Sequence, residues 1–252
     1  MSEASTFVVI PCYNEEIRFP KDRYLQFLDR TKGYHFLFVN DGSKDSTSEV
    51  LRSLRQQHPD RIDVLELPQN SGKAEAVRQG FLKGLDSNAQ FLAFWDADLA
   101  TPLESLPLFL NVFQGRSNVE MVFGSRIKLL GRDIQRSELR HYLGRIFATC
   151  ASLVLRLGVY DTQCGAKVFR KTEVLRQVFS QPFKSRWIFD VELIARYLHL
   201  KKTKGDTDID SSIYELPLPI WRDIAGSKLK PTDFFKAFVE LVRIYQTYRR
   251  AG

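Results

Sequence analysis

Two aspartates separated by one alanine follow a run of apolar residues in the stretch FLAFWDADLATP, which spans residues 91–102. Asp96 and Asp98 on one loop could hold a hard divalent cation such as Mg²⁺ or Mn²⁺, because these ions prefer carboxylate oxygens and share their coordination shell with substrate phosphates. Two solvated carboxylates at an ordinary strand end are the alternative. The position of the pair after a central apolar run, with other polar segments expected beside it, favours a metal site.

Three further polar segments follow apolar runs and contain side chains suited to a nucleotide. In PCYNEE, Tyr13 could stack on a base and Glu15 could make a polar contact. In NDGSKDS, Asp41 could accept hydrogen bonds from a nucleobase or ribose, although Asn-Asp-Gly is also ordinary turn chemistry. In PQNSGK, Lys73 begins a helix after a glycine, where a lysine and the helix N-terminus can neutralise a diphosphate. The phosphate-loop pattern G-x-x-x-x-G-K-[ST] and the dinucleotide pattern G-x-G-x-x-G are absent.

The elements that carry these segments alternate between apolar runs and helical stretches, which predicts an α/β fold. Strands are expected at residues 6–11, 34–40, 62–67, 90–95 and 119–125, with helices between them. Near-continuous apolar strands of this kind indicate a mostly parallel sheet flanked by helices on both faces. Ligands bind beyond the carboxyl ends of such strands, so the four polar segments are expected to meet at one rim.

Helix starts can also be predicted. Ser46 and Glu49 have capping-box spacing, and Thr101 is expected as the N-cap of a helix with Pro102 at its first position and Glu104 as its box partner.

The second half begins with an arginine-rich loop that leads into a helix ending at Leu155. We then expect a loop and short strand at 161–170, a helix at 187–200, an extended segment at 212–221 and a helix at 232–248. We interpret residues 1–252 as one domain with a C-terminal helical elaboration.

Composition and charge narrow the class of protein. The 252 residues carry a net charge of +7, which suggests an anionic partner such as nucleic acid, an acidic membrane or a phosphorylated substrate. We find no recognised nucleic-acid module or aromatic-basic surface pattern, so we expect no nucleic acid. The three cysteines are scattered without metal-ligand spacing, which indicates a reducing compartment. No apolar run approaches the ~20 residues of a spanning helix.

The motifs PCYNE, NDGSKDST, NSGKAEAVRQG, DADLATP and GSR, in this order and spacing, resemble the GT-A glycosyltransferases of family 2. In the second half RDIQRSELR, DTQCGAKVF, WIFDVELI and GSKLKP are similar to the dolichyl-phosphate glucosyltransferase branch, and less closely to the mannose synthase branch. The resemblance covers nearly the whole chain. It implies a Rossmann-like GT-A fold, with a nucleotide-sugar half at about 1–125 and an acceptor half at about 126–252.

The resemblance also assigns roles to individual positions. Asp96 and Asp98 match the motif that binds the nucleotide sugar and the metal, Mg²⁺ or Mn²⁺. Lys73 at its helix start completes the expected nucleotide-sugar site. This site comprises Pro11, Tyr13, Glu15, Asp41, Lys73, Asp96, Ala97 and Asp98. The positions expected to hold phosphates of donor and lipid acceptor are Arg126, Arg140, Arg222, Ser227 and Lys228, since an arginine fork meets phosphate oxygens in pairs.

The donor is expected to be UDP-glucose. Mannose synthases of this type carry a metal-binding glutamine where Ala100 stands, and the glucosyltransferase branch resembles this sequence in having alanine there. The expected acceptor is a polyprenyl or dolichyl phosphate, whose ionised oxygen needs no general base, so we expect direct displacement with inversion. Asp190 and Glu192 are reserve candidates for a base; at spacing i, i+2 they cannot share a helix face.

Other interpretations stay open at this point. One is a GT-A enzyme that uses GDP-mannose or another donor, or a soluble glycan or protein acceptor. A non-catalytic nucleotide-sugar binder is another. A nucleotidyltransferase is disfavoured because PCYNEE lacks a glycine-rich signature. The eukaryotic members of the glucosyltransferase branch begin with a membrane anchor, whereas this chain begins with the polar MSEAST.

We expect a protein bound peripherally to the cytoplasmic face of a membrane. Contact would come through the 126–145 segment and a C-terminal helix whose apolar stripe either faces lipid or packs on the domain. That stripe comprises Phe234, Phe235, Phe238, Val242 and Tyr245.

Overall fold

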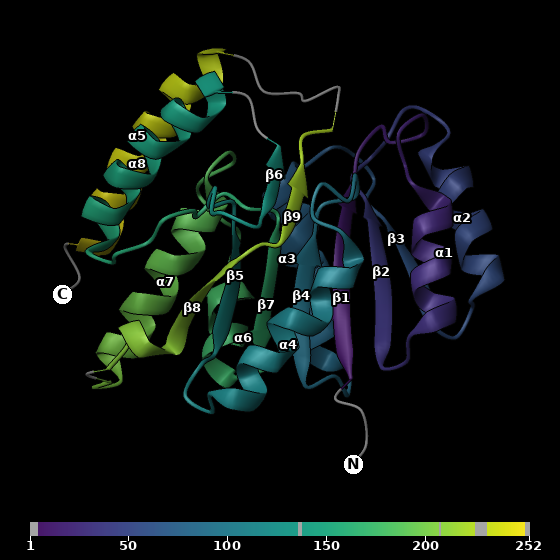
Figure 1. Ribbon diagram of the computed structural model, residues 1–252, viewed down its shortest axis with the longest axis horizontal. Coiled ribbons are helices and arrows are strands. Elements are labelled where there is room, and N and C mark those ends of the chain that lie inside the picture. Colours follow the sequence, from purple (N-terminus) through teal and green to yellow (C-terminus); the bar gives the residue numbers. More distant parts are fainter. Residues whose placement is uncertain (1–4, 136–137, 207, 225–230, 250–252) are drawn as a thin grey trace.

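A computed structural model describes residues 5–135, 138–206, 208–224 and 231–249 of the chain (Figure 1). A seven-stranded sheet runs through the middle of the molecule in the order β3-β2-β1-β4-β7-β5-β8. All neighbouring strands are parallel except at β7, which runs antiparallel to both β4 and β5. The prediction of a mostly parallel sheet flanked by helices is confirmed.

The strands of this sheet are short, and the central ones are buried on both faces. Their bounds are β1 Thr6–Cys12, β2 Tyr34–Asn40, β3 Ile62–Glu66, β4 Phe91–Trp95, β5 Met121–Ser125, β7 Ala166–Arg170 and β8 Ile213–Pro217. A second, two-stranded sheet pairs β6 (Asp133–Gln135) with β9 (Ile220–Arg222) in parallel.

Helices cover both faces of the large sheet because alternate side chains of each strand point to opposite sides. On β1, Val8 and Ile10 belong to one hydrophobic core and Phe7 and Val9 to another. The first core is closed by α1 (Lys21–Arg30), α2 (Thr47–Gln57) and α4 (Leu106–Gly115). The second is closed by α3 (Lys73–Asp86), α5 (Glu138–Leu155), α6 (Glu173–Ser180), α7 (Phe189–Thr203) and α8 (Pro231–Arg249).

Two predicted helix caps are wrong in detail. Pro102 has extended backbone angles (φ −60°, ψ 145°); a short 3₁₀ turn, Leu103–Ser105, follows, and α4 begins only at Leu106. The Thr101 carbonyl accepts a hydrogen bond from Trp95 Nε1 at 2.7 Å, so this segment belongs to the aspartate loop and not to the helix. Ser46 is the N-cap of α2, but its side chain makes no cap bond; Asp45 Oδ1 accepts from the Thr47 amide instead.

The helices α5 and α8 lie side by side at one end of the molecule, beyond α7 (Figure 1). On α8 the residues that pack inward are Ala237, Leu241 and Ile244, whereas Phe238 and Val242 of the predicted stripe are 36% and 56% exposed. The side chains of Phe234 and Phe235 lie outside the described residues. Within the part of the chain that the structure describes, none of the helices combines the length and the apolar character needed to cross a membrane.

The three thiols differ in accessibility, which gives a first prediction. Cys12 and Cys164 are buried, whereas Cys150 on α5 is partly exposed. Burial raises the pKa of Cys164 to about 11, so its thiol is protonated at neutral pH and is a poor nucleophile. We expect iodoacetamide to modify Cys150 first in the native protein. Peptide mass spectrometry would measure this, and equal labelling of Cys164 before unfolding would contradict it.

Candidate active site

The loop that contains the two aspartates is held from three sides. The Trp95 indole donates to the Thr101 carbonyl, and the buried Tyr24 hydroxyl donates to the Ala97 carbonyl at 3.1 Å. The backbone amide of Arg222 on β9 donates to the Ala100 carbonyl at 3.0 Å. These bonds fix the backbone, so both carboxylates are presented in one arrangement.

Gly165, in the segment DTQCG, packs directly against the first aspartate. Its carbonyl accepts a hydrogen bond from the Asp96 amide at 2.9 Å. A Cβ atom at position 165 would lie 1.8 Å from Asp96 Oδ2 and 2.1 Å from its Cγ, which no side chain could occupy. Glycine is therefore required at this position by the placement of the Asp96 carboxylate.

Lys73, the first residue of α3, reaches across to Asp96, and its Nζ lies 2.5 Å from Asp96 Oδ1. Both side chains remain open to solvent, with 40% and 37% of their surface exposed. Loss of solvation opposes the charged ammonium, but Asp96 and Asp190 outweigh it and raise the pKa of Lys73. The predicted neighbourhood of Lys73 and the aspartate pair is thus present in the structure.

Asp98 carries the electrostatic signature of a cation site. Burial, followed by the nearby negative charge of Asp96, raises the pKa of the Asp98 carboxyl, and the positive charges of Lys73 and Arg18 only partly oppose this rise. Asp98 Oδ1 also accepts from the Ala100 amide at 3.0 Å. A buried carboxylate beside a second carboxylate is a donor set whose charge a hard divalent cation stabilises.

The residues fit such a cation only as a partial shell. Among the described residues, no group of three or more histidine, cysteine, aspartate or glutamate side chains could enclose a metal ion. Asp96 and Asp98 would supply two oxygen ligands, and Ala100 none from its side chain. This matches the coordination of Mg²⁺ and Mn²⁺ in sites where substrate phosphates and water complete the shell.

Asp41 closes the loop between β2 and α2 onto the loop before α3. Its carboxylate accepts from the amides of Ser71 (2.7 Å) and Gly72 (2.8 Å) and from Asn70 Nδ2 (3.0 Å). Burial raises the pKa of Asp41, while these amides oppose the rise. The structure therefore places Asp41 beside Lys73 and gives it a structural task, so a nucleoside contact stays a prediction.

The loop after β1 lies at the same rim. Pro11 is within β1, and the buried Glu15 pairs with Arg18 through both of its oxygens, with Arg18 Nη2 2.5 Å from Glu15 Oε1. Hydrogen bonding to Glu15 raises the pKa of Arg18, and the charges of Asp98 and Asp96 contribute. Arg18 is thus a cation near the acidic loop that the sequence reasoning missed.

Asp190 and Glu192 point in different directions from α7. Asp190 Oδ1 lies 2.6 Å from Nζ of Lys167, whose side chain is completely buried and also donates to the Cys164 carbonyl at 2.6 Å. Glu192 is buried on the side of α8, where it pairs with Arg196 at 2.8 Å. Of these two carboxylates, only Asp190 lies near Lys73, and its ion-pair partner is Lys167.

Of the predicted phosphate-binding residues, two are described in full. Arg126 makes a two-pronged ion pair with Asp161, at 2.6 and 2.8 Å, and its guanidinium stacks 5.3 Å from the Trp221 ring centroid. Arg222 is largely exposed and lies 3.0 Å from Asp133. Ser227 and Lys228 lie outside the described residues, as does the side chain of Arg140; its backbone is part of α5.

This fold and site define a GT-A glycosyltransferase, and the comparisons agree. Residues 7–177 match the family described as Glycosyl transferase family 2, to which the chain therefore belongs. It is similar to the dolichyl-phosphate β-glucosyltransferase of Homo sapiens, at 35% identity over 89% of this chain and 69% of that protein. The corresponding protein of Dictyostelium discoideum is 32% identical over 96% of this chain and 74% of its own length. The resemblance inferred from the motifs is confirmed.

Solved structures show the same fold. Glucosyl-3-phosphoglycerate synthase from Mycobacterium tuberculosis, in complex with Mn²⁺, uridine diphosphate and glucosyl-3-phosphoglycerate, superposes with a TM-score of 0.67. The match covers 98% of this chain and 80% of that one, at 15% sequence identity. At this identity the likeness concerns the fold.

Proposed function

We propose that this enzyme transfers glucose from UDP-glucose to a polyprenyl phosphate with inversion at the anomeric carbon. The observation that carries the proposal is the fixed acidic loop facing Lys73 at the carboxyl end of the sheet, where two carboxylates can hold a divalent cation that, with the ammonium, receives a nucleotide diphosphate. The acceptor class is supported by the relatives, which are named dolichyl-phosphate β-glucosyltransferases. The donor is supported by Ala100 and by the uridine diphosphate in the fold neighbour.

The roles of the residues follow from charge. Asp96 and Asp98 would hold Mg²⁺ or Mn²⁺, which when bound supplies positive charge to the diphosphate. Pro11, Tyr13, Glu15 and Asp41 would contact the nucleoside, and Lys73 the diphosphate. Arg126, Arg140, Arg222, Ser227 and Lys228 would hold the acceptor phosphate, so that residues of about 1–125 serve the donor and those of about 126–252 the acceptor.

The reaction needs little proton transfer. An oxygen of the acceptor phosphate attacks the anomeric carbon, the bond from that carbon to the diphosphate oxygen breaks, and the electron pair leaves with UDP. Asp190 is bound to the buried Lys167 and only 5% exposed. That position suits a fixed negative charge beside Lys73 better than a base that must collect a proton.

The proposal is tested by incubating the protein with Mn²⁺ and radiolabelled UDP-glucose or GDP-mannose, each with a short polyprenyl phosphate or a soluble sugar acceptor. We expect label in the lipid phase only with UDP-glucose and the polyprenyl phosphate. Transfer from GDP-mannose alone, or to the soluble acceptor alone, would replace the proposal by the corresponding alternative.

Replacement of Asp98 by asparagine should remove the metal dependence of donor binding. Asparagine keeps the oxygen that accepts from Ala100 but loses the charge. Since even outer-shell substitutions at metal sites cost about 10- to 100-fold in affinity, we expect UDP-glucose binding in Mn²⁺ to weaken at least tenfold. Calorimetric titration with Mn²⁺ and with a chelator would measure this. Equal affinity of the native protein under both conditions would refute the metal role.

We also propose that the α5–α8 pair docks on an anionic membrane at the cytoplasmic face. Large apolar side chains are exposed on both helices: Tyr142, Ile146 and Leu153 on α5, and Phe238, Val239 and Val242 on α8. The net charge of +7 complements anionic lipid, where each nearby basic residue contributes about 1 kcal/mol. The lipid tail of the proposed acceptor would enter from this surface.

Sedimentation with liposomes tests the membrane contact. We expect binding to anionic vesicles at low salt, release at high salt because the attraction is screened, and reduced binding for the variant Ile146→Ser/Val242→Ser. Both replaced side chains are 56% exposed, so the fold should tolerate them. Protein that remains in the supernatant with anionic vesicles at low salt would contradict peripheral docking.

A further inference from the structure

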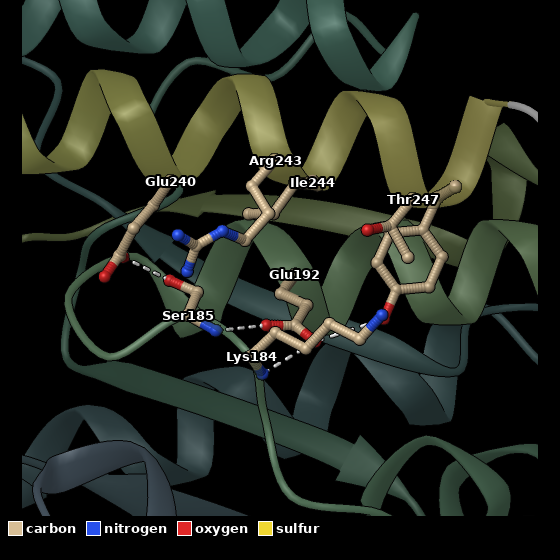
Figure 2. A pocket seen from close by; sticks show the side chains of 8 residues that line it. Lys184, Ser185, Glu192, Glu240, Arg243, Ile244 and Thr247 are labelled. Carbon is tan, nitrogen blue, oxygen red and sulfur yellow. Dashed lines mark hydrogen bonds between the residues drawn. The ribbon is translucent and has the colours of Figure 1, made fainter.

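Five consecutive backbone amides in the loop that leads into α7 donate to two carboxylates from different helices. The amides of Lys184 and Ser185 donate to Glu192 at 3.1 and 2.7 Å. The next three amides, of residues 186–188, donate to Glu240 of α8 at 3.1 to 3.2 Å. Ser185 Oγ donates to the same glutamate at 2.5 Å. Figure 2 shows Glu240 reaching down from α8 to Ser185, with Glu192 on the other side of the loop.

Four of these amides belong to the loop before α7, and only the amide of Ile188 belongs to the helix end. The first amides of a helix have no intrahelical acceptor, and the positive end of the helix dipole favours a carboxylate there, so Glu240 of α8 also caps α7. Ile188 is the N-cap of α7, and its own side chain makes no cap bond. The pocket of Figure 2 lies along this junction and is lined by none of the residues of the acidic loop. Glu240 therefore ties the loop of residues 184–188 to α8.

The side chain of Arg186 leaves this loop on the side of α3. Its Nη2 donates to Asn70 Oδ1 at 3.2 Å, and its Nε lies 3.1 Å from where a Cβ atom at Gly72 would be. Gly72 is the N-cap of α3 with φ +93°, a conformation that favours glycine. Asn70 and Gly72 both donate to Asp41, and the charge of Arg186 favours the ionised form of Asp41. Arg186 thus covers the turn that precedes Lys73.

We propose that Arg186 is a positioning residue for the nucleotide-sugar site and that α8 holds it in place through Glu240. The guanidinium packs on the turn of residues 70–72, and this turn sets where Lys73 points toward Asp96. Removing Arg186 frees the turn, and removing the charge of Glu240 frees Arg186. The C-terminal helix, which lies on the side of the proposed acceptor, thereby controls donor affinity. The inference rests on the proposed function in taking UDP-glucose as the donor.

The matched variants are Arg186→Ala and Lys184→Ala, which remove the same charge from the same loop. Lys184 lines the pocket of Figure 2, between the loop and α8, and no hydrogen bond or ion pair joins its side chain to the α3 turn in the part of the chain that the structure describes. We expect Arg186→Ala to weaken UDP-glucose binding in calorimetry by about tenfold, the range for loss of a charge-assisted hydrogen bond. Lys184→Ala should leave UDP-glucose binding unchanged. The melting temperature and the acceptor KM should stay unchanged in both variants. Arg186→Lys should recover part of the affinity.

Glu240→Gln should also weaken UDP-glucose binding. The double variant Arg186→Ala/Glu240→Gln should bind UDP-glucose no more weakly than Arg186→Ala, because both changes act on the contact between Arg186 and the turn of residues 70–72. Hydrogen exchange gives a readout that needs no donor: the amides of Ser71 and Gly72 should exchange faster in Arg186→Ala and Glu240→Gln than in Lys184→Ala. Unchanged exchange in both variants, or additive losses of affinity, overturns the inference. A native protein that does not bind UDP-glucose but shows the expected exchange pattern overturns the proposed function alone.

Discussion

Replacement of Gly165 by alanine should abolish transfer while leaving most of the fold intact. The added Cβ atom would lie 1.8 Å from Asp96 Oδ2, so the Asp96 carboxylate must move away from Lys73. A displacement of about 1 Å at a reacting centre can cost roughly 100-fold in rate, and we expect at least this loss in kcat/KM with UDP-glucose. Steady-state kinetics and a thermal melt on the same preparation would measure it.

The chain offers a close control for this change. Gly158→Ala alters another glycine near the same segment, but its Cβ atom would meet nothing within 4 Å, so kinetics and melting should stay as in the native protein. In the variant Gly165→Ala/Asp96→Ala the clash is relieved, and the melting temperature should recover without recovery of activity. Native activity in Gly165→Ala would show that the position of Asp96 does not limit the reaction.

The second large effect is expected from Lys167→Met. Lys167 is fully buried, and its ammonium is shared between Asp190 and the Cys164 carbonyl, with the Phe94 and Phe123 ring centroids at 5.0 and 5.5 Å. Removing one partner of a buried pair leaves an uncompensated charge, which typically costs about 3–5 kcal/mol of stability. We expect a loss of this size in the free energy of unfolding, measured by urea denaturation.

The double variant Lys167→Met/Asp190→Leu separates packing from charge. Replacement of a whole buried ion pair by apolar side chains is often neutral, so most of the lost stability should return. Transfer activity in this stable variant then reports on Asp190: retained turnover excludes it as an essential base. If the double variant is no more stable than Lys167→Met, the cost arises from packing around the lysine stem and not from an unpaired Asp190.

The rim of the sheet could be predicted from the sequence because its signals are local. Apolar runs followed by polar segments, such as those that contain Asp41, Lys73 and Asp96, give both the strand and its polar end, and parallel strands bring those ends together. Gly165 and Tyr24 could not be found this way. Each acts through one contact across the fold, with Asp96 and with the Ala97 carbonyl, and neither residue type carries a chemical signal of its own.

The predicted N-cap of α4 is a case in which a clear local sequence signal gave the wrong helix start. Thr101 and Pro102 have the residue types of a helix start, and local propensity favours one there. The Thr101 carbonyl is taken by Trp95, however, and the Ala100 carbonyl by the amide of Arg222, whose strand lies far along the chain. These bonds keep Pro102 extended, so that a 3₁₀ turn at Leu103–Ser105 precedes α4, which begins at Leu106. Sequence reasoning also missed the cations Arg18 and Lys167, because a single basic residue in a loop or strand is usually a surface charge.

The position of β7 between β4 and β5 affects the solubility of any chain that ends before β7. β4 and β5 follow one another in sequence but are not neighbours; β7, made much later, fills the gap between them. A nascent chain that has emerged only through residue 125 therefore exposes an unpaired edge of β4, whose apolar residues are a template for aggregation. Fragments that end there should be recovered as inclusion bodies.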